Sequence, residues 1–207
     1  MTNNWAQKHQ STAESHRAKG AFEHAGEYFT LAGYAQVSHR PPGRFGQSIS
    51  RGLYYLFHSV VCYRLSRHPS ARDQIRCDQG VLLVEDMQER LSEKPTPANE
   101  FDRARVGAWD EFRGDFATLA GDSEEAEQAY DAAKECYKKA ENFDLGFAER
   151  EHRDLIQFYE DLALASGEEL SDWYERKTDL SFPEWINHKR EHLPAYFETV
   201  IERGKWR

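Results

Sequence analysis

The sequence predicts an all-α protein, and two observations carry that prediction. Apolar residues recur at spacings of three and four along most of the 207 residues, the period of a helix buried on one side. Runs of alternating apolar and polar residues bounded by turns, the pattern of half-buried strands, do not occur in the sequence. Twelve Phe, ten Tyr and five Trp supply enough large apolar side chains for one core, so we expect a single domain.

The N-terminal half is expected to hold three helices separated by proline-containing breaks. Pro41-Pro42 ends the first, because proline lacks an amide donor and disfavours helical geometry in the preceding residue. Pro95 and Pro97 end the third, and we expect a hinge at 95–97 between the halves 1–94 and 98–207 of one domain. The expected helices span about 12–37, 46–66 and 70–92.

The C-terminal half is expected to hold five helices, with recognisable capping residues. Ser123 and Ser181 are predicted N-caps, since a serine oxygen can accept hydrogen bonds from the first amides of a helix. Gly167 suits a left-handed helix end, Pro183 suits a first turn, and Pro194 is expected to kink the last helix. The expected spans are about 100–120, 123–140, 144–166, 168–177 and 181 onward.

The apolar periodicity also predicts which side chains form the core. The predicted core comprises Phe22, Phe29, Leu53, Val60, Leu82, Trp109, Phe116, Tyr130, Leu155, Tyr159 and Phe197.

One segment of the sequence is repeated. Residues 26–33, Gly-Glu-Tyr-Phe-Thr-Leu-Ala-Gly, align with residues 114–121, Gly-Asp-Phe-Ala-Thr-Leu-Ala-Gly, and both end in Thr-Leu-Ala-Gly. The second copy continues into small and aromatic residues at helical steps, and a periodic repeat of this kind is typical of stacked helical hairpins. The repeat-defining residues are Gly26, Gly33, Gly114, Gly121, Ala126, Tyr130 and Ala133.

This pattern resembles the tetratricopeptide repeat, with Asp110 and Arg113 where the family prefers Trp and Leu. Its aromatic-rich, irregular style is similar to that of SNAP-type helical adaptors. The resemblance implies an irregular right-handed solenoid of seven to eight antiparallel helices. It also implies a non-catalytic adaptor or scaffold, without a cofactor, that binds a helix or peptide of another protein in a helical-repeat groove.

The charge is unevenly distributed. Between residues 28 and 77 the chain has seven arginines and one acidic residue, Asp73, although the net charge of the whole chain is −9. This asymmetry indicates an anionic partner, so we expect an acidic protein segment to dock there. The alternative is internal pairing with carboxylates of the C-terminal half, and a second alternative is nucleic-acid or ribonucleoprotein binding by the segment 40–76. The residues predicted to contact the partner are Arg40, Arg44, Arg51, Arg72 and Arg76.

One string of residues has the spacing of a metallopeptidase motif. His188-Lys189-Arg190-Glu191-His192 fits H-x-x-E-H, in which the two histidines share a zinc ion and Glu191 acts as base. A metal-dependent hydrolase is therefore a third hypothesis. Such sites need a third ligand, and only fifteen residues follow, so we interpret the string as a solvated polar face and expect no catalytic residues.

Composition favours a cytoplasmic location. No apolar run approaches the roughly 18 residues of a membrane span, so we expect no membrane association, and the first residues lack the basic and apolar blocks of a secretory signal. Cys62, Cys77 and Cys136 share no metal-ligand spacing and are interpreted as reduced core residues. An acidic chain with 18 Arg and only nine Lys also suits a salt-rich cytoplasm.

Overall fold

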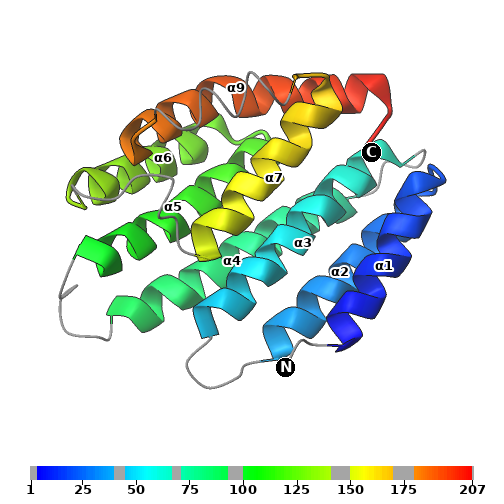
Figure 1. Ribbon diagram of the computed structural model, residues 1–207, viewed down its shortest axis with the longest axis horizontal. Coiled ribbons are helices and arrows are strands. Elements are labelled where there is room, and N and C mark those ends of the chain that lie inside the picture. Colours follow the sequence, from blue (N-terminus) through cyan, green and yellow to red (C-terminus); the bar gives the residue numbers. More distant parts are fainter. Residues whose placement is uncertain are drawn as a thin grey trace.

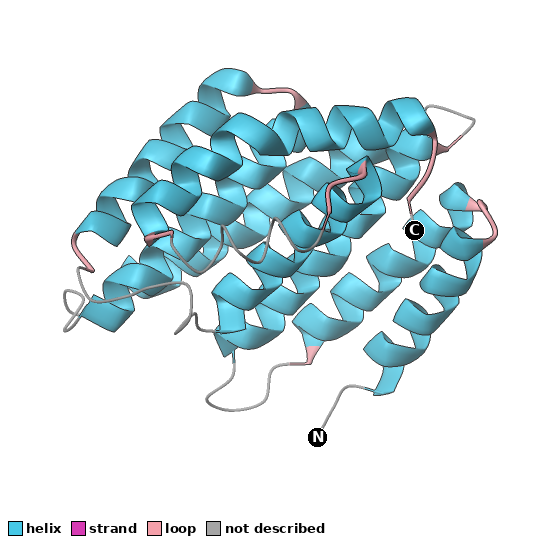
Figure 2. Ribbon diagram, turned by 45° about the horizontal axis from the view of Figure 1, so that its top comes forward, coloured by secondary structure: helices cyan, strands magenta, loops and turns pink. Residues whose placement is uncertain are grey.

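The computed structural model contains eight α-helices in the part of the chain that it describes. That part comprises residues 4–39, 45–66, 71–92, 100–140, 150–169 and 180–206. Every long regular element within these ranges is an α-helix, as the periodicity predicts (Figure 2). The helices are α1 (Asn4–Ala18), α2 (Phe22–Ser38), α3 (Phe45–Leu65), α4 (Arg72–Ser92), α5 (Glu100–Ala120), α6 (Ser123–Lys138), α7 (Arg150–Ser166) and α9 (Phe182–Arg203).

The helices pack mostly as sequential antiparallel pairs. Each helix from α1 to α5 packs against the next one in the chain, and α9 packs against both α6 and α7. Helix α3 lies near the middle, because it contacts α7 and α9 as well as its sequence neighbours. Figure 1 shows α9 along one edge, beside α6 and α7, while α1 and α2 form the opposite edge.

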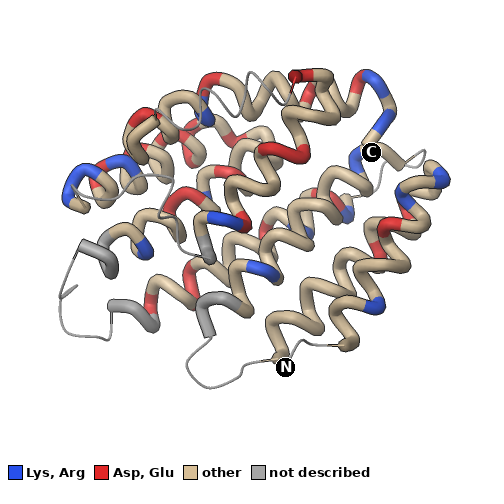
Figure 3. Tube along the Cα trace, in the orientation of Figure 1, with Lys and Arg blue, Asp and Glu red and all other residues tan. Residues whose placement is uncertain are grey.

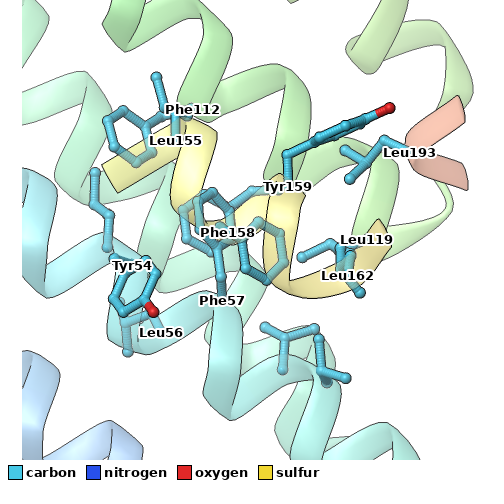
Figure 4. Close-up of a cluster of buried hydrophobic side chains, with 14 of the residues drawn as sticks. Tyr54, Leu56, Phe57, Phe112, Leu119, Leu155, Phe158, Tyr159, Leu162 and Leu193 are labelled. Carbon is cyan, nitrogen blue, oxygen red and sulfur yellow. The ribbon is translucent and has the colours of Figure 1, made fainter. Parts of the chain in front are cut away.

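The core is one continuous cluster of apolar side chains drawn from both halves of the chain. Phe57 of α3 stacks against Phe116 of α5 at a ring-centroid distance of 4.1 Å and against Phe158 of α7 at 4.4 Å. Figure 4 shows these α3 and α7 side chains interdigitating beside Phe112. Because such rings bury large apolar areas, this contact holds the two halves together.

The N-terminal region forms two helices, so the prediction of one helix over 12–37 was wrong. Helix α1 ends at Ala18 and α2 begins at Phe22. Gly20 lies between them with φ +71°, a conformation that a residue with a Cβ rarely adopts. The apolar period continues across the break, and this continuity concealed the turn from sequence analysis.

Several predicted helix ends are confirmed, and one is corrected. Gly167 has φ +100°, the predicted left-handed helix end, and Ser181 stands at the N-cap of α9 with Pro183 in its first turn. Asp122, rather than Ser123, is the N-cap of α6: its carboxylate accepts a hydrogen bond from the amide of Glu125 at 3.1 Å. Pro194 lies inside α9. The hinge predicted at 95–97 and the short helix predicted at 168–177 fall outside or largely outside the described residues.

The first glycine of each repeat copy, Gly26 or Gly114, has the same structural role, whereas Gly33 lies inside α2 and Gly121 makes a turn. A Cβ added at Gly114 would lie 2.6 Å from the ring of Tyr130, and one at Gly26 would lie 3.0 Å from the ring of Tyr63. Each glycine therefore lets an aromatic ring of a neighbouring helix approach its backbone. The hydroxyl four residues later, on Thr30 or Thr118, donates to the glycine carbonyl oxygen at 2.9 or 2.8 Å.

Candidate functional site

Helix α4 presents a row of solvent-exposed side chains that includes a leucine. Gln74, Asp78, Leu82 and Glu85 follow one another at steps of three or four residues, so they share one face of the helix. The side chain of Leu82 is 63% exposed. Its predicted place in the core was therefore wrong, because Leu82 lies about 160° around the helix from the buried Val84 and the two side chains cannot both face inward.

The end of α5 and the turn into α6 stand opposite this face. Gly121, with φ +82°, makes the turn, and the amide of Asp122 donates to the carbonyl oxygen of Ala117 at 2.9 Å. Glu124 and Glu125 then occupy the first turn of α6, where acidic side chains interact favourably with the helix dipole. The local sequence of a helix start therefore concentrates carboxylates at this position.

Between these two walls lies a groove of about 870 Å³, here called the α4–α6 groove. Cys77, Phe116 and Ala117 lie almost fully buried at its floor, so the apolar side chains within reach of a ligand are Leu82, Val81 and Ala120. Its acidic residues are Asp78, Glu85, Asp122, Glu124 and Glu125. No Lys, Arg or His lines the groove within the described residues.

Two of the five groove carboxylates already have structural partners. Glu125 forms an ion pair with Arg113, and Asp122 caps α6. Among the described residues, the hydrogen-bond donors to Asp78 and Glu124 are neutral glutamine amides, Gln74 at 3.0 Å and Gln128 at 3.4 Å. Figure 3 marks in red the acidic residues carried by α4, α5 and α6. The groove is therefore an apolar surface with an excess of negative charge.

Comparison with protein-family models, with curated proteins and with solved structures finds no match for this chain. The function must therefore be inferred from the geometry of the groove and of the polar clusters around it.

A buried ionic cluster lies behind the groove and was missed by sequence analysis. Lys189 of α9 contacts Glu111 of α5 at 2.7 Å and Asp115 of α5 at 2.6 Å, and all three side chains are fully buried. The interpretation of the string 188–192 as a solvated polar face was thus wrong for Lys189. The available signal was the four-residue spacing of Glu111 and Asp115, which places both carboxylates beside the apolar stripe of α5.

Aromatic side chains complete the hydrogen bonding of these carboxylates. Trp185 and Tyr137 donate to Glu111 at 2.8 and 2.6 Å, and Tyr130 donates to Asp115 at 2.9 Å. Burial raises the pKa of Asp115 to about 7, whereas Lys189 holds the pKa of Glu111 below its ordinary value against the effect of burial. The cluster joins α5, α6 and α9 without an opening to solvent, which suits a structural role.

A second set of polar contacts joins α3 to α7. Asp154 accepts a hydrogen bond from Ser50 at 2.8 Å and forms an ion pair with Arg51 at 2.8 Å. Two turns further along α7, Asp161 accepts from Tyr54 at 2.9 Å and lies 3.2 Å from His58. Arg51, a predicted docking residue, thus contacts a carboxylate of the C-terminal half.

The other predicted docking arginines are engaged within the N-terminal half or lie outside the described residues. Arg72 contacts Glu23 at 3.1 Å and Glu27 at 3.3 Å. Arg76 donates to the hydroxyl of Tyr34 at 3.1 Å. Arg40 and Arg44 lie outside the described residues. Arg51 thus pairs with a carboxylate of the C-terminal half, as the internal-pairing alternative expects, whereas Arg72 pairs within the N-terminal half.

The two histidines of the H-x-x-E-H string lie side by side. Their ring centroids are 4.1 Å apart, His188 Nε2 lies 2.9 Å from the hydroxyl of Tyr159, and His192 Nδ1 lies 2.8 Å from the carbonyl oxygen of His188. The described residues contain no group of three or more His, Cys, Asp or Glu placed to hold a metal ion.

Two further sequence expectations concern cysteines and membranes. Cys62 and Cys77 are buried, and burial raises the pKa of each thiol to about 12, so both are poor nucleophiles. Cys136 is only partly buried. None of the helices described has the length and apolarity needed for a membrane span.

Proposed function

We propose that this chain is a non-catalytic adaptor that binds a segment of another protein in the α4–α6 groove. The observation that carries the proposal is Leu82, a large apolar side chain that is 63% exposed at the edge of an apolar groove. Isolated exposed leucines are common, but one beside a groove with further apolar lining marks an interaction site. The equivalent glycine–tyrosine contacts of the two repeat copies support the finer proposal of an irregular tetratricopeptide-like solenoid.

The groove is large enough to hold several side chains of a bound protein segment. About 870 Å³ spread along a helix face accommodates a few side chains from one face of a bound segment. Asp115, whose pKa burial raises to about 7, is fully buried with Glu111 and Lys189, and none of the three lines the groove. Binding therefore accounts for this site better than chemistry does.

The two alternatives from sequence analysis have less support. Nucleic-acid binding by the segment 40–76 would require Arg51 and Arg72 to leave carboxylates that they already contact. A metal-dependent hydrolase would require a third ligand beside His188 and His192, and the described residues supply none in position.

The test is site-specific photo-crosslinking in the native cell. A photoreactive amino acid replaces Leu82, and a matched control replaces Leu164, an exposed leucine of α7 that lies away from the groove. We expect position 82, and not position 164, to form an adduct with one protein that mass spectrometry identifies. The purified partner should then bind the wild-type chain and the L164E variant but not L82E. Equal crosslinking at both positions, or unchanged binding by L82E, would contradict the proposal.

A further inference from the structure

The α4–α6 groove has one sign of charge around an apolar floor. Besides Asp122, which caps α6, four carboxylates line it: Asp78 and Glu85 from α4, and Glu124 and Glu125 from the start of α6. Glu125 is compensated by Arg113, whereas the other three carboxylates contact no basic side chain across the described lining of the groove. A ligand bound there must satisfy an apolar surface and several exposed carboxylates at once.

We propose that the segment bound in this groove is a basic amphipathic helix, with apolar side chains facing Leu82 and Val81 and Lys or Arg side chains on its flanks. This inference rests on the proposed function and specifies the partner. Sequence analysis led us to expect an acidic partner at the arginine-rich segment. The partner proposed here is basic, and it binds the acidic α4–α6 groove.

The spacing of the α4 residues fits a helical partner. Asp78 and Glu85 are seven residues apart, which corresponds to about 10 Å along the helix, with Leu82 between them. An antiparallel or parallel helix that places a leucine against Leu82 carries basic residues three or four positions before and after it at the same separation. Glu124 on the opposite wall is then available to a third basic side chain.

Charge decides between a basic and an acidic occupant. An acidic segment would bring further carboxylates toward a surface that has no basic residue in its described lining, and like-charge contacts of this kind reject wrong partners. A basic segment is attracted from solution to the same surface. Because the carboxylates are exposed, that attraction should weaken strongly with added salt.

The inference is tested with a defined helical peptide library displayed on phage. Each peptide has 16 residues, an alanine background and three leucines at positions 5, 8 and 12, and its flanking positions vary among Lys, Glu and Gln. Selection on the wild-type chain is followed by counter-selection on L82E. We expect the L82E-sensitive binders to be enriched in Lys at the flanks and depleted in Glu.

The outcomes separate the two proposals. Groove-dependent binders enriched in Glu or Gln would overturn the basic partner and leave the proposed function standing. An absence of L82E-sensitive binders in the library, together with failure of position 82 to crosslink, would overturn both.

A charge-reversal pair provides a second readout on one selected Lys-rich peptide. We expect D78K/E85K to weaken its binding by roughly tenfold or more, and a peptide with Glu at the flanks to recover that loss. The matched control is E198K/E202K, which makes the same charge change on exposed positions of α9 outside the groove. Equal weakening by both variants would show a general effect of net charge and would contradict the inference.

Discussion

Lys189 of α9 lies 2.6 Å from Asp115 of α5, and solvent reaches neither side chain. With Glu111 also in contact, two carboxylates share one ammonium group in the core. Such an arrangement costs solvation free energy, which its hydrogen bonds must offset. It therefore couples the position of α9 to that of α5, and α5 forms part of the groove.

Removal of the ammonium group should be strongly destabilising. K189M retains most of the apolar stem but leaves the Glu111 and Asp115 carboxylates buried without a counter-charge. We expect the free energy of unfolding to fall by about 3–5 kcal/mol, measured by urea denaturation at pH 7. K134M, which removes an exposed lysine of α6 that contacts Asn187, is the control and should change stability by less than about 0.5 kcal/mol. A K189M variant as stable as K134M would contradict this role of the cluster.

The pH dependence of stability should contain a contribution from Asp115. Its pKa is about 7 in the folded chain and near 3.8 in the unfolded chain, so the folded state binds an extra proton between these values. Stability from this group is complete below about pH 4 and is lost as pH rises through 7. D115N cannot titrate. We expect wild type to lose on the order of 2 kcal/mol relative to D115N between pH 5 and pH 8, measured by denaturant unfolding. A difference that stays constant across this range would contradict the assignment.

The two repeat glycines should tolerate alanine unequally. At position 114 a Cβ would lie 2.6 Å from the Tyr130 ring, and at position 26 it would lie 3.0 Å from the Tyr63 ring. We expect G114A to lose about 1–3 kcal/mol of stability through overpacking. G26A should lose less, since the clash is milder and alanine favours the helix by about 1 kcal/mol. Thermal unfolding of both variants decides the order, and a less stable G26A would contradict the contact geometry.

Alanine substitutions at two leucines should differ in their effect on stability, because one leucine lies in the core and the other lines the groove. L155A removes a fully buried side chain and should cost about 2–5 kcal/mol of stability. L82A removes an exposed one and should cost less than about 0.5 kcal/mol, while reducing binding in the groove. Urea denaturation measures the first quantity, and titration with a selected peptide measures the second. If L82A unfolded as readily as L155A, Leu82 would belong to the core rather than to the groove.

Much of the fold could be predicted because its signals are local. The helix expected at 100–120 occurs as α5, and the expected spans 46–66 and 70–92 agree closely with α3 and α4. Turn and cap residues such as Gly167 and Ser181 affect the backbone only a few positions away, so their effect can be predicted from the local sequence. The break at Gly20 was missed because the apolar period runs through it.

The candidate site was less predictable because it depends on which helix faces meet. The sequence by itself determined the helical class, most helix ends and the repeated glycines, since spacing, capping and residue size are properties of neighbouring positions. Only the tertiary structure decided that Leu82 faces solvent, that Lys189 lies between Glu111 and Asp115, and that carboxylates from α4 and α6 surround one groove. Burial and charge pairing follow from contacts between residues far apart in the chain, 78 positions for Glu111 and Lys189, and helical periodicity carries no information about such distant partners.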